Sequence, residues 1–324
     1  MLKLKHLVEN FDLAKEALSQ WEHDPETLDK ALSRFRISSN AIYPFFRDGA
    51  LCFLRLAPTE EKLECNLQGE LEFLTYLQEK DFPALRPIPS KTGELLLTLT
   101  TVWGEYYACA FEKVPGKPIE DTEPTETVLY EYGRTLGRLH ALSADFMQIT
   151  KKWSHKDALD WAESVLSAYS APEKMHAELT KVRELLADLP TNPGQYGLVH
   201  YDFESDNVFF DPATESCAVI DFDDGMYHWY ALDIEQALDS LSELLPEENF
   251  PAAKVKFLQG YASARSLPEQ LEELLPLMRR FVDLFGYARL LRCVSEKPEQ
   301  VPQWMEKLEK KLRYVLTVRE AKMK

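Results

Sequence analysis

The hydrophobic positions at the start of the chain recur with the spacing of helices. Apolar residues lie three or four positions apart from Leu7 to Leu18, and Leu28 and Leu32 repeat the pattern. This spacing predicts two short amphipathic helices within residues 1–34. The segment "HDPET" between them combines a turn with a typical helix start.

Strand-like runs follow these helices. The sequence "AIYPFF-RDG-ALCFLRLAP" places a strong Asp-Gly turn signal between two apolar runs, which predicts a β-hairpin over residues 41–58. An amphipathic helix is expected over residues 59–80, and two further strands are expected on either side of Gly104 and Glu105. Residues 1–113 are therefore predicted to form N-terminal helices and a small lobe built on an antiparallel sheet.

The pattern changes at residues 114–124, whose sequence "VPGKPIEDTEP" contains three prolines and one glycine. We predict a hinge or linker there. Residues 125–324 show mainly helical periodicity, interrupted by two short strand-like runs between residues 198 and 225. The expected helices are 126–143, 155–168, 172–188, 231–245, 252–265, 268–295 and 301–318. The fold class expected is α+β, with a small sheet-rich lobe followed by a larger, mainly helical lobe.

Composition and charge narrow the classes of function. The 324 residues are 45% hydrophobic and carry a formal net charge of −17. We expect a folded chain that binds neither nucleic acid nor an anionic membrane surface, because phosphate groups would be repelled. No run approaches the roughly 18 apolar residues of a membrane span, and the start of the chain lacks the apolar core of a signal peptide. The five cysteines show no metal-binding spacing and fit a reducing compartment, so a cytoplasmic location is expected.

The acidic stretch "LVHYDFESDNVFFDPATESCAVIDFDDG", residues 198–225, carries the most specific signal. His200, Asp202 and Asn207 form the pattern H-x-D-x-x-x-x-N, and Asp221 follows at the end of the apolar run "CAVI". The segment "NVFF-DPATES-CAVID" predicts a hairpin, which would bring Asn207 and Asp221 together. An amide oxygen and a carboxylate suit Mg²⁺, and a carboxylate left off the metal can accept a proton from a hydroxyl group. These are the groups needed to transfer a phosphoryl group to an alcohol.

The motif "HYDFESDN…VIDFDD" also resembles the catalytic and metal-binding segments of the aminoglycoside phosphotransferase and choline kinase family, which is related to protein kinases. The resemblance implies a protein-kinase-like fold of two lobes, the cofactors ATP and Mg²⁺, and a small-molecule acceptor. It also implies that Asp202 is the catalytic base, that Asn207 and Asp221 hold Mg²⁺, and that His200 supports the loop. Asp233, in "YALDIEQAL", would bind the backbone of the same loop. The segment "LGRLHALS" looks like the helix that follows the hinge in this family.

The small lobe offers candidate nucleotide-binding residues. Kinase-like folds use a cationic side chain on the third strand, oriented by a helix carboxylate, to hold the α- and β-phosphates. Arg55 near the end of a predicted strand and Glu70 in the following helix fit these roles, with arginine where the family more often has lysine. The other residues expected at the nucleotide are Ser39 and Asn40, from a phosphate loop without glycine, and Glu112 and Val114, from the hinge.

The acceptor is expected in the helical lobe, because the nucleotide occupies the small one. Carboxylates and aromatic rings beside Asp202 favour a protonated amine, so we expect an amino sugar or an amino alcohol that carries a hydroxyl group. The candidate acceptor-binding residues are Glu204, Asp206, Asp223, Tyr227 and Trp229. The aromatic members of this set could instead pack in the core.

Two other functions stay open at this point. The segment "AVIDFDDG" matches the D-x-D nucleophile motif of haloacid-dehalogenase-type phosphatases, although that motif normally opens a doubly wound sheet and only helical pattern follows it here. A kinase-like scaffold that binds nucleotide without catalysis is the second alternative. It is favoured by the arginine at position 55 and by the glycine-free phosphate loop.

Overall fold

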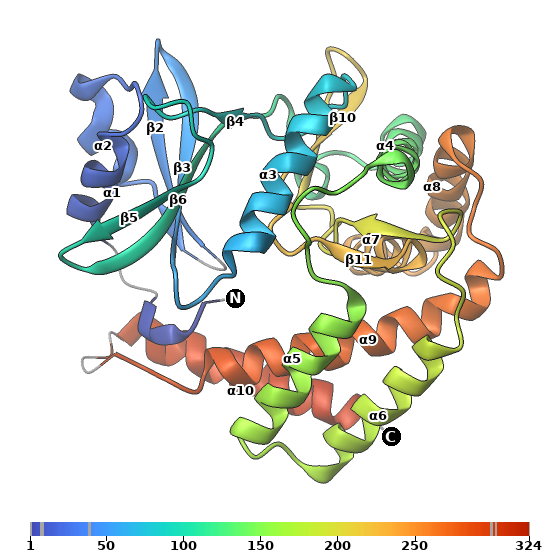
Figure 1. The fold of residues 1–324 in the computed structure, drawn as a ribbon. Coiled ribbons are helices and arrows are strands. Elements are labelled where there is room, and N and C mark those ends of the chain that lie inside the picture. The colour runs from blue at the N-terminus through green and yellow to red at the C-terminus, as the bar shows by residue number, and fades with distance from the viewer. Residues whose placement is uncertain (1, 7–9, 38–39, 299–300, 302, 324) are drawn as a thin grey trace.

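The computed structural model describes residues 2–6, 10–37, 40–298, 301 and 303–323. Figure 1 shows two lobes, of which the first is built on an antiparallel sheet and the second, larger one is mainly helical. The α+β, bilobal, protein-kinase-like fold predicted from the sequence is thereby confirmed.

The small lobe holds a six-stranded sheet with helices on both faces. Every pairing in this sheet is antiparallel, in the order β1-β2-β3-β6-β4, and β5 pairs with β6. The strands are β1 (Arg36–Ile37), β2 (Ala41–Arg47), β3 (Ala50–Pro58), β4 (Pro87–Ile88), β5 (Leu97–Thr101) and β6 (Gly104–Glu112). The helices are η1 (Leu4–His6), α1 (Phe11–Leu18), η2 (Pro25–Thr27), α2 (Leu28–Leu32) and α3 (Glu64–Glu79).

The alternation of side chains along β3 decides which of them reaches the site. Cys52, Leu54 and Leu56 pack with α1 and α2 in one apolar cluster. Because successive strand residues point to opposite faces, Arg55 faces the other way, toward α3, where it meets Glu70. One face of the strand thus stabilises the small lobe, and the other presents a cation.

The large lobe is helical apart from two short antiparallel strand pairs. Its elements are α4 (Glu126–Asp145), α5 (His155–Ala168), α6 (Glu173–Ala187), β8 (Tyr196–Val199), β9 (Val208–Asp211), β10 (Ser216–Val219), β11 (Met226–Trp229), α7 (Ala231–Leu244), α8 (Phe250–Ala264), α9 (Leu271–Cys293) and α10 (Gln303–Lys322). Between the lobes lie β7 (Lys117–Pro118) and η3 (Ile119–Asp121). Strands β9 and β10 form a hairpin within the acidic stretch, called the acidic hairpin below. Strand β7 pairs with β9, so the connection between the lobes is attached to this hairpin.

Helices α4 and α8 approach each other closely because both carry glycine at the contact. A Cβ atom on Gly133 would lie 1.9 Å from the carbonyl oxygen of Phe257, and one on Gly260 would lie 1.9 Å from that of Tyr130. Helix α4 also supports the acidic stretch, since the Tyr132 hydroxyl donates a 2.7 Å hydrogen bond to the Phe203 carbonyl.

The structure differs from the sequence-based expectation in the start of one helix and in a pair of strands. The helix expected over residues 59–80 begins only at Glu64, and residues 59–63 form a loop. Strands β8 and β11 pair on either side of the acidic stretch and were not predicted. All strands named here pair antiparallel, so the doubly wound sheet that the phosphatase alternative requires is absent from the described ranges. Within these ranges, no helix has the length and apolar character needed to span a bilayer.

Candidate active site

One buried carboxylate holds the loop between β8 and β9, residues 200–207, which is called the catalytic loop below. Asp233, at the start of α7, accepts hydrogen bonds from the backbone N–H groups of His200 (2.7 Å) and Tyr201 (2.8 Å). Its Oδ2 also lies 2.9 Å from His140 Nε2. A fully buried carboxylate with several donors is a strong anchor, and the expected contact between Asp233 and the loop backbone is present.

His200 connects this loop to the end of β10. Its Nδ1 accepts a hydrogen bond from the Asp202 N–H at 3.2 Å, and its Nε2 lies 2.8 Å from the Ile220 carbonyl oxygen. Burial lowers the pKa of His200, against the opposing charge of Asp233. A neutral ring that accepts at Nδ1 must carry its proton on Nε2 and donate it to Ile220. His200 therefore positions the loop.

The acidic hairpin brings Asn207 and Asp221 together, as the spacing predicts. The Ile220 N–H donates a 3.0 Å hydrogen bond to the Asn207 carbonyl, and Asp221 is the next residue. The Asn207 side-chain NH₂ donates to Asp202, at 3.0 Å to its carbonyl oxygen and 3.4 Å to Oδ2. Because the amide nitrogen is used in this way, its oxygen Oδ1 is the atom available to a cation.

Burial and mutual repulsion destabilise the ionised carboxylates of this site, so a bound cation would stabilise them. Burial, with the charges of Asp223 and Asp202, raises the pKa of Asp221 well above its ordinary value. Burial and Glu204 likewise raise the pKa of Asp202. Asp221 also adopts a positive φ of 66°, an uncommon conformation that aspartate tolerates better than most side chains.

The donor set fits Mg²⁺ only in part. In the described part of the chain no three His, Cys, Asp or Glu side chains are grouped to hold a metal by themselves. Asn207 Oδ1 and the Asp221 carboxylate are hard oxygen ligands, and Mg²⁺ in nucleotide sites is commonly held by one or two protein oxygens together with phosphates and water. The residues thus fit a metal that arrives with a nucleotide.

Asp223 is bound by the small lobe, through contacts that the sequence did not indicate. It accepts a hydrogen bond of 2.8 Å from Asn40 Nδ2 and pairs with Lys62. Although burial alone raises its pKa, the charges of Lys62 and Arg55 hold that pKa well below the ordinary value. A buried carboxylate with these partners ties the lobes together. Asp223 also lines the cavity described below, so its contact with an acceptor stays a prediction. The Nζ of Lys152, another buried cation, donates to the Gly225 carbonyl at 2.7 Å.

Arg55 and Glu70 form the predicted pair in full. Arg55 Nη1 and Nη2 donate to the two carboxylate oxygens of Glu70 at 2.9 and 2.6 Å. The guanidinium also lies 4.9 Å from the ring centroid of Phe111. Both charged side chains are buried, so the fork of the arginine is held in one orientation.

The remaining nucleotide candidates lie near the connection between the lobes or on the phosphate loop. Glu112 is the last residue of β6, and Val114 follows it in a buried position. Asn40 is buried beside Asp223, and its Oδ1 has no partner among the described residues. Ser39 lies outside the described residues.

Of the remaining acceptor candidates, Trp229 was predicted wrongly. Trp229 is 1% exposed and donates from Nε1 to the Pro190 carbonyl at 2.8 Å, which makes it a core residue and not a pocket wall. Tyr227 is half-buried, packs against the main apolar cluster and does not line the cavity described below. Glu204 and Asp206 lie on the α7 side of the loop, where burial and the charge of Asp206 raise the pKa of Glu204 to about 7.

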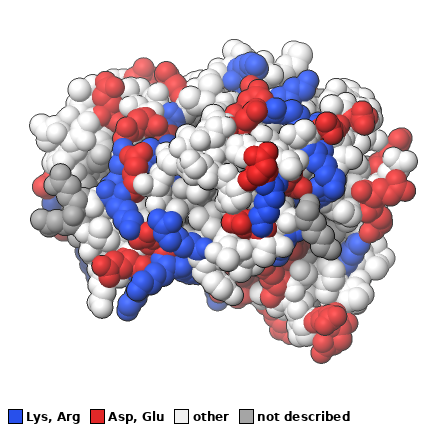
Figure 2. All heavy atoms as spheres, turned by 90° about the horizontal axis from the view of Figure 1, so that it is seen from below, with Lys and Arg blue, Asp and Glu red and all other residues white. Residues whose placement is uncertain are grey.

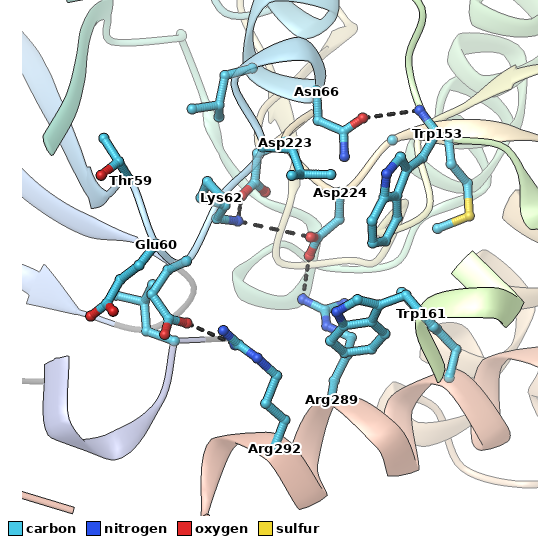
Figure 3. Close-up of a pocket in the computed structure, with 17 residues that line it drawn as sticks. Thr59, Glu60, Lys62, Asn66, Trp153, Trp161, Asp223, Asp224, Arg289 and Arg292 are labelled. Carbon is cyan, nitrogen blue, oxygen red and sulfur yellow. Dashed lines mark hydrogen bonds and ion pairs between the residues drawn. The ribbon is translucent and has the colours of Figure 1, made fainter. Parts of the chain in front are cut away.

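A cavity of about 250 Å³ opens between the lobes beside this site. Figure 3 shows Lys62 and Glu60 of the β3–α3 loop on one side, Trp153 and Trp161 on the other, and arginines of α9 beneath. The sequence did not indicate these residues, because they come from separate segments without a shared motif. Only the three-dimensional arrangement identifies them, because charged side chains of both lobes pair with Asp223 and Asp224 (Figure 3).

Comparison with known proteins agrees with this geometry. Amicoumacin kinase of Bacillus subtilis (strain 168) is 25% identical over 226 residues, which cover 65% of this chain and 66% of that protein. Homoserine kinase of Caulobacter vibrioides (strain NA1000 / CB15N) is 30% identical over 222 residues, or 65% of each chain. The chain thus spans slightly less than two thirds of the length of these relatives.

Solved structures show the same fold along nearly the whole chain. An amicoumacin kinase in complex with AMP-PNP and Ca²⁺ superimposes with a TM-score of 0.77 at 18% identity, covering 98% of this chain and 95% of that one. A microcompartment-associated aminopropanol kinase gives 0.66 at 20% identity, covering 96% and 97%. The profile of the phosphotransferase enzyme family matches residues 45–274. The chain therefore belongs to the phosphotransferase enzyme family.

Proposed function

We propose that this protein is an ATP- and Mg²⁺-dependent O-phosphotransferase that acts on a small hydroxyl-bearing molecule, with an amino alcohol or amino sugar as the acceptor class. The observation that carries the proposal is the placement of Asp202 beside Asn207, with the half-buried Asp221 at the base of the same hairpin. The names of the homoserine and aminopropanol kinases support an acceptor with both a hydroxyl and an amino group.

In this proposal Asp202 acts as the general base. Its carboxylate accepts the proton of the acceptor hydroxyl while that oxygen forms a bond to the γ-phosphorus of ATP and the bond from this phosphorus to the β–γ bridging oxygen breaks, releasing ADP. The Asn207 NH₂ group orients the carboxylate through its 3.4 Å contact with Oδ2. The His200 ring and Asp233 hold the loop that carries Asp202.

Asn207 Oδ1 and the Asp221 carboxylate would hold Mg²⁺. The metal, when bound, would neutralise charge on the phosphates. Arg55, fixed by Glu70, would meet the α- and β-phosphates, and backbone groups near Asn40 and Ser39 would approach the phosphates from the small lobe. Glu112 and Val114 would offer backbone groups to adenine.

A nucleotide-consumption assay with Mg²⁺ and a panel of amino alcohols, amino sugars and hydroxylated amino acids tests the proposal. We expect ADP release that depends on one acceptor and yields its phosphate ester, identified by mass spectrometry. Binding of ATP without any acceptor-dependent ADP release across the panel would favour the inactive nucleotide-binding scaffold. Failure to bind ATP with Mg²⁺ at all would exclude both.

A further inference from the structure

The charge around the cavity differs from that of the whole molecule. The chain has a net charge of −17, yet the cavity between the lobes is close to balanced, because its lining holds three cations, Lys62, Arg289 and Arg292, beside the carboxylates Glu60, Glu61, Asp223 and Asp224. Figure 2 likewise shows Lys and Arg side chains among Asp and Glu on the face of the molecule seen there. Charges within a few ångströms dominate the recognition of a bound group, because distant ones are screened.

The carboxylates of the cavity are largely occupied by partners from the protein. Asp224 accepts a hydrogen bond from Arg289 and lies 4.0 Å from Lys62. Glu61, whose side chain is 1% exposed, accepts a 2.7 Å hydrogen bond from Arg292. These two carboxylates, like Asp223, are paired with cations of the protein, and Glu60, whose side chain is 61% exposed, is the more accessible carboxylate of the lining.

The arginines, by contrast, keep unused hydrogen-bond donors. A guanidinium has five N–H donors. Among the described residues, Arg289 donates one side-chain hydrogen bond, from Nη2 to Asp224, and Arg292 donates one, from Nη1 to Glu61. Their side chains are 18% and 17% exposed. The planar fork of arginine matches the two oxygens of a carboxylate, so the cavity offers donors for an anionic group.

The cavity also adjoins the candidate catalytic base. The Arg289 guanidinium lies 5.7 Å from the ring centroid of Tyr201, the residue before Asp202. The charges of Arg289 and Asp224 both act on the pKa of Asp202. Figure 3 shows Trp161 close to Arg289 on the far side of the cavity from Lys62. A molecule in the cavity would therefore meet an apolar wall and two arginines, one of which packs against the residue before Asp202.

We propose that the acceptor carries a carboxylate in addition to its hydroxyl group, and that Arg292 and Arg289 bind this carboxylate. The cavity thus selects hydroxylated amino acids over the amino alcohols that lack the carboxylate. The volume of about 250 Å³ restricts the acceptor to a small molecule, since pockets for drug-sized ligands start near 300 Å³. The proposal rests on the phosphotransferase function proposed above, and it narrows the acceptor class given there to molecules that carry a carboxylate beside the hydroxyl and amino groups.

Three matched pairs of compounds test this selection: homoserine with 3-amino-1-propanol, serine with ethanolamine, and threonine with 1-amino-2-propanol. The members of each pair differ only by one carboxylate. Binding is measured by calorimetry with Mg²⁺ and AMP-PNP, so that the result does not depend on turnover, and transfer is measured separately with ATP. We expect at least one carboxylate-bearing member to bind at least tenfold more tightly than its partner.

The variant Arg292→Gln should remove most of this preference by weakening the carboxylate-bearing member about tenfold, with little change for its partner. Arg280→Gln is the matched control, because Arg280 lies on the same helix and pairs with Glu178 away from the cavity. If Arg292→Gln unfolds, Arg292→Lys keeps the charge but loses the fork and should show a weaker preference than the parent.

Three outcomes would overturn the proposal: tighter binding of the carboxylate-free members, no binding of any pair, or a preference that Arg292→Gln leaves intact. A loss of AMP-PNP affinity in Arg292→Gln, without a change in the acceptor preference, would show that the arginine serves the nucleotide phosphates instead. If carboxylate-bearing members bind as expected but no phosphate ester forms with ATP, the function proposal fails while the assignment of the cavity stands.

Discussion

At the scale of single residues, the site includes one pair of opposite charges that is buried and held together by two hydrogen bonds. Arg55 is 4% exposed and its only carboxylate partner among the described residues is Glu70, which is 1% exposed. Removing one member of such a pair leaves the other charge buried and unpaired, whereas replacing both with apolar side chains is often neutral for stability. Stability and function can therefore be separated at this pair.

We expect Arg55→Ala to lower the free energy of unfolding by about 3–5 kcal/mol. The double variant Arg55→Met with Glu70→Leu should recover most of this loss in urea denaturation, yet bind Mg²⁺-ATP as poorly as Arg55→Ala. Recovery of nucleotide affinity together with stability would mean that Arg55 has no contact with the phosphates.

At the scale of elements, the close packing of α4 against α8 supports the catalytic loop. Gly133 and Gly260 each face a carbonyl oxygen of the opposite helix at a distance that leaves no room for a Cβ atom. Helix α4 then carries Tyr132 and His140, which bond to the loop and to Asp233. A change in the spacing of the two helices should therefore reach the loop.

The variant Gly133→Ala tests this packing, because the close approach of the helices predicts a loss of stability where an ordinary helical site predicts a gain. A glycine-to-alanine change inside a helix ordinarily stabilises by about 1 kcal/mol. Here we expect a loss of about 2 kcal/mol or more in the free energy of unfolding, because the new methyl group would clash with the Phe257 carbonyl. Chemical denaturation that showed a gain in stability would contradict the short approach of the two helices.

At the scale of the whole molecule, ion pairs between the lobes surround the site. Lys62 and Asn40 of the small lobe bind Asp223 of the large one. Glu61 of the β3–α3 loop pairs with Arg292 of α9. These contacts fix the small lobe over the catalytic loop, so their loss should loosen the relative placement of the lobes.

The pair at Glu61 gives a pH-dependent prediction. Burial raises the pKa of Glu61, but hydrogen bonds from His6 and Arg292 outweigh it and lower that pKa from 4.5 to about 2. A lowered folded-state pKa means that the stabilisation is complete above pH 4.5 and is lost as the pH falls toward 2. Glu61→Gln should therefore cost on the order of 2–3 kcal/mol at neutral pH.

The difference in the free energy of unfolding between Glu61→Gln and the parent should shrink as the pH falls below 4.5 toward 2, where Glu61 becomes protonated in the folded protein. The control is Glu60→Gln, because Glu60 is a neighbouring carboxylate with a side chain 61% exposed, and exposed pairs contribute little. A difference that does not change with pH would contradict the ion pair as the source of the effect.

The sequence predicted the parts of the site that are local in the chain. His200, Asp202 and Asn207 lie within one loop, and a hairpin of ordinary length returns the chain to Asp221, so spacing alone brings them together. The Arg55–Glu70 contact was likewise predictable, because a strand and the helix after it pack side by side.

The cavity was not predictable, because its contacts join distant segments. Lys62 and Asp223 are 161 positions apart, and Arg289 and Asp224 are 65 apart. The burial of the aromatic residues of β11 depends on tertiary packing. Nothing in the segment "YHWY" indicates that the Trp229 side chain lies in the core. The start of α3 was predicted five residues too early, because residues 59–62 are polar and compatible with a first helical turn.

The measurement that tests the central claim most directly is turnover and nucleotide binding by Asp202→Asn. The side chains have the same shape, and the loop is held by Asp233 and His200, so we expect an unchanged fold and unchanged affinity for Mg²⁺-ATP. Because asparagine cannot accept the acceptor's proton, phosphoryl transfer measured as ester formation should fall by a factor of about 10² or more. Transfer at a rate near that of the parent, with nucleotide affinity intact, would contradict the assignment of Asp202 as the base.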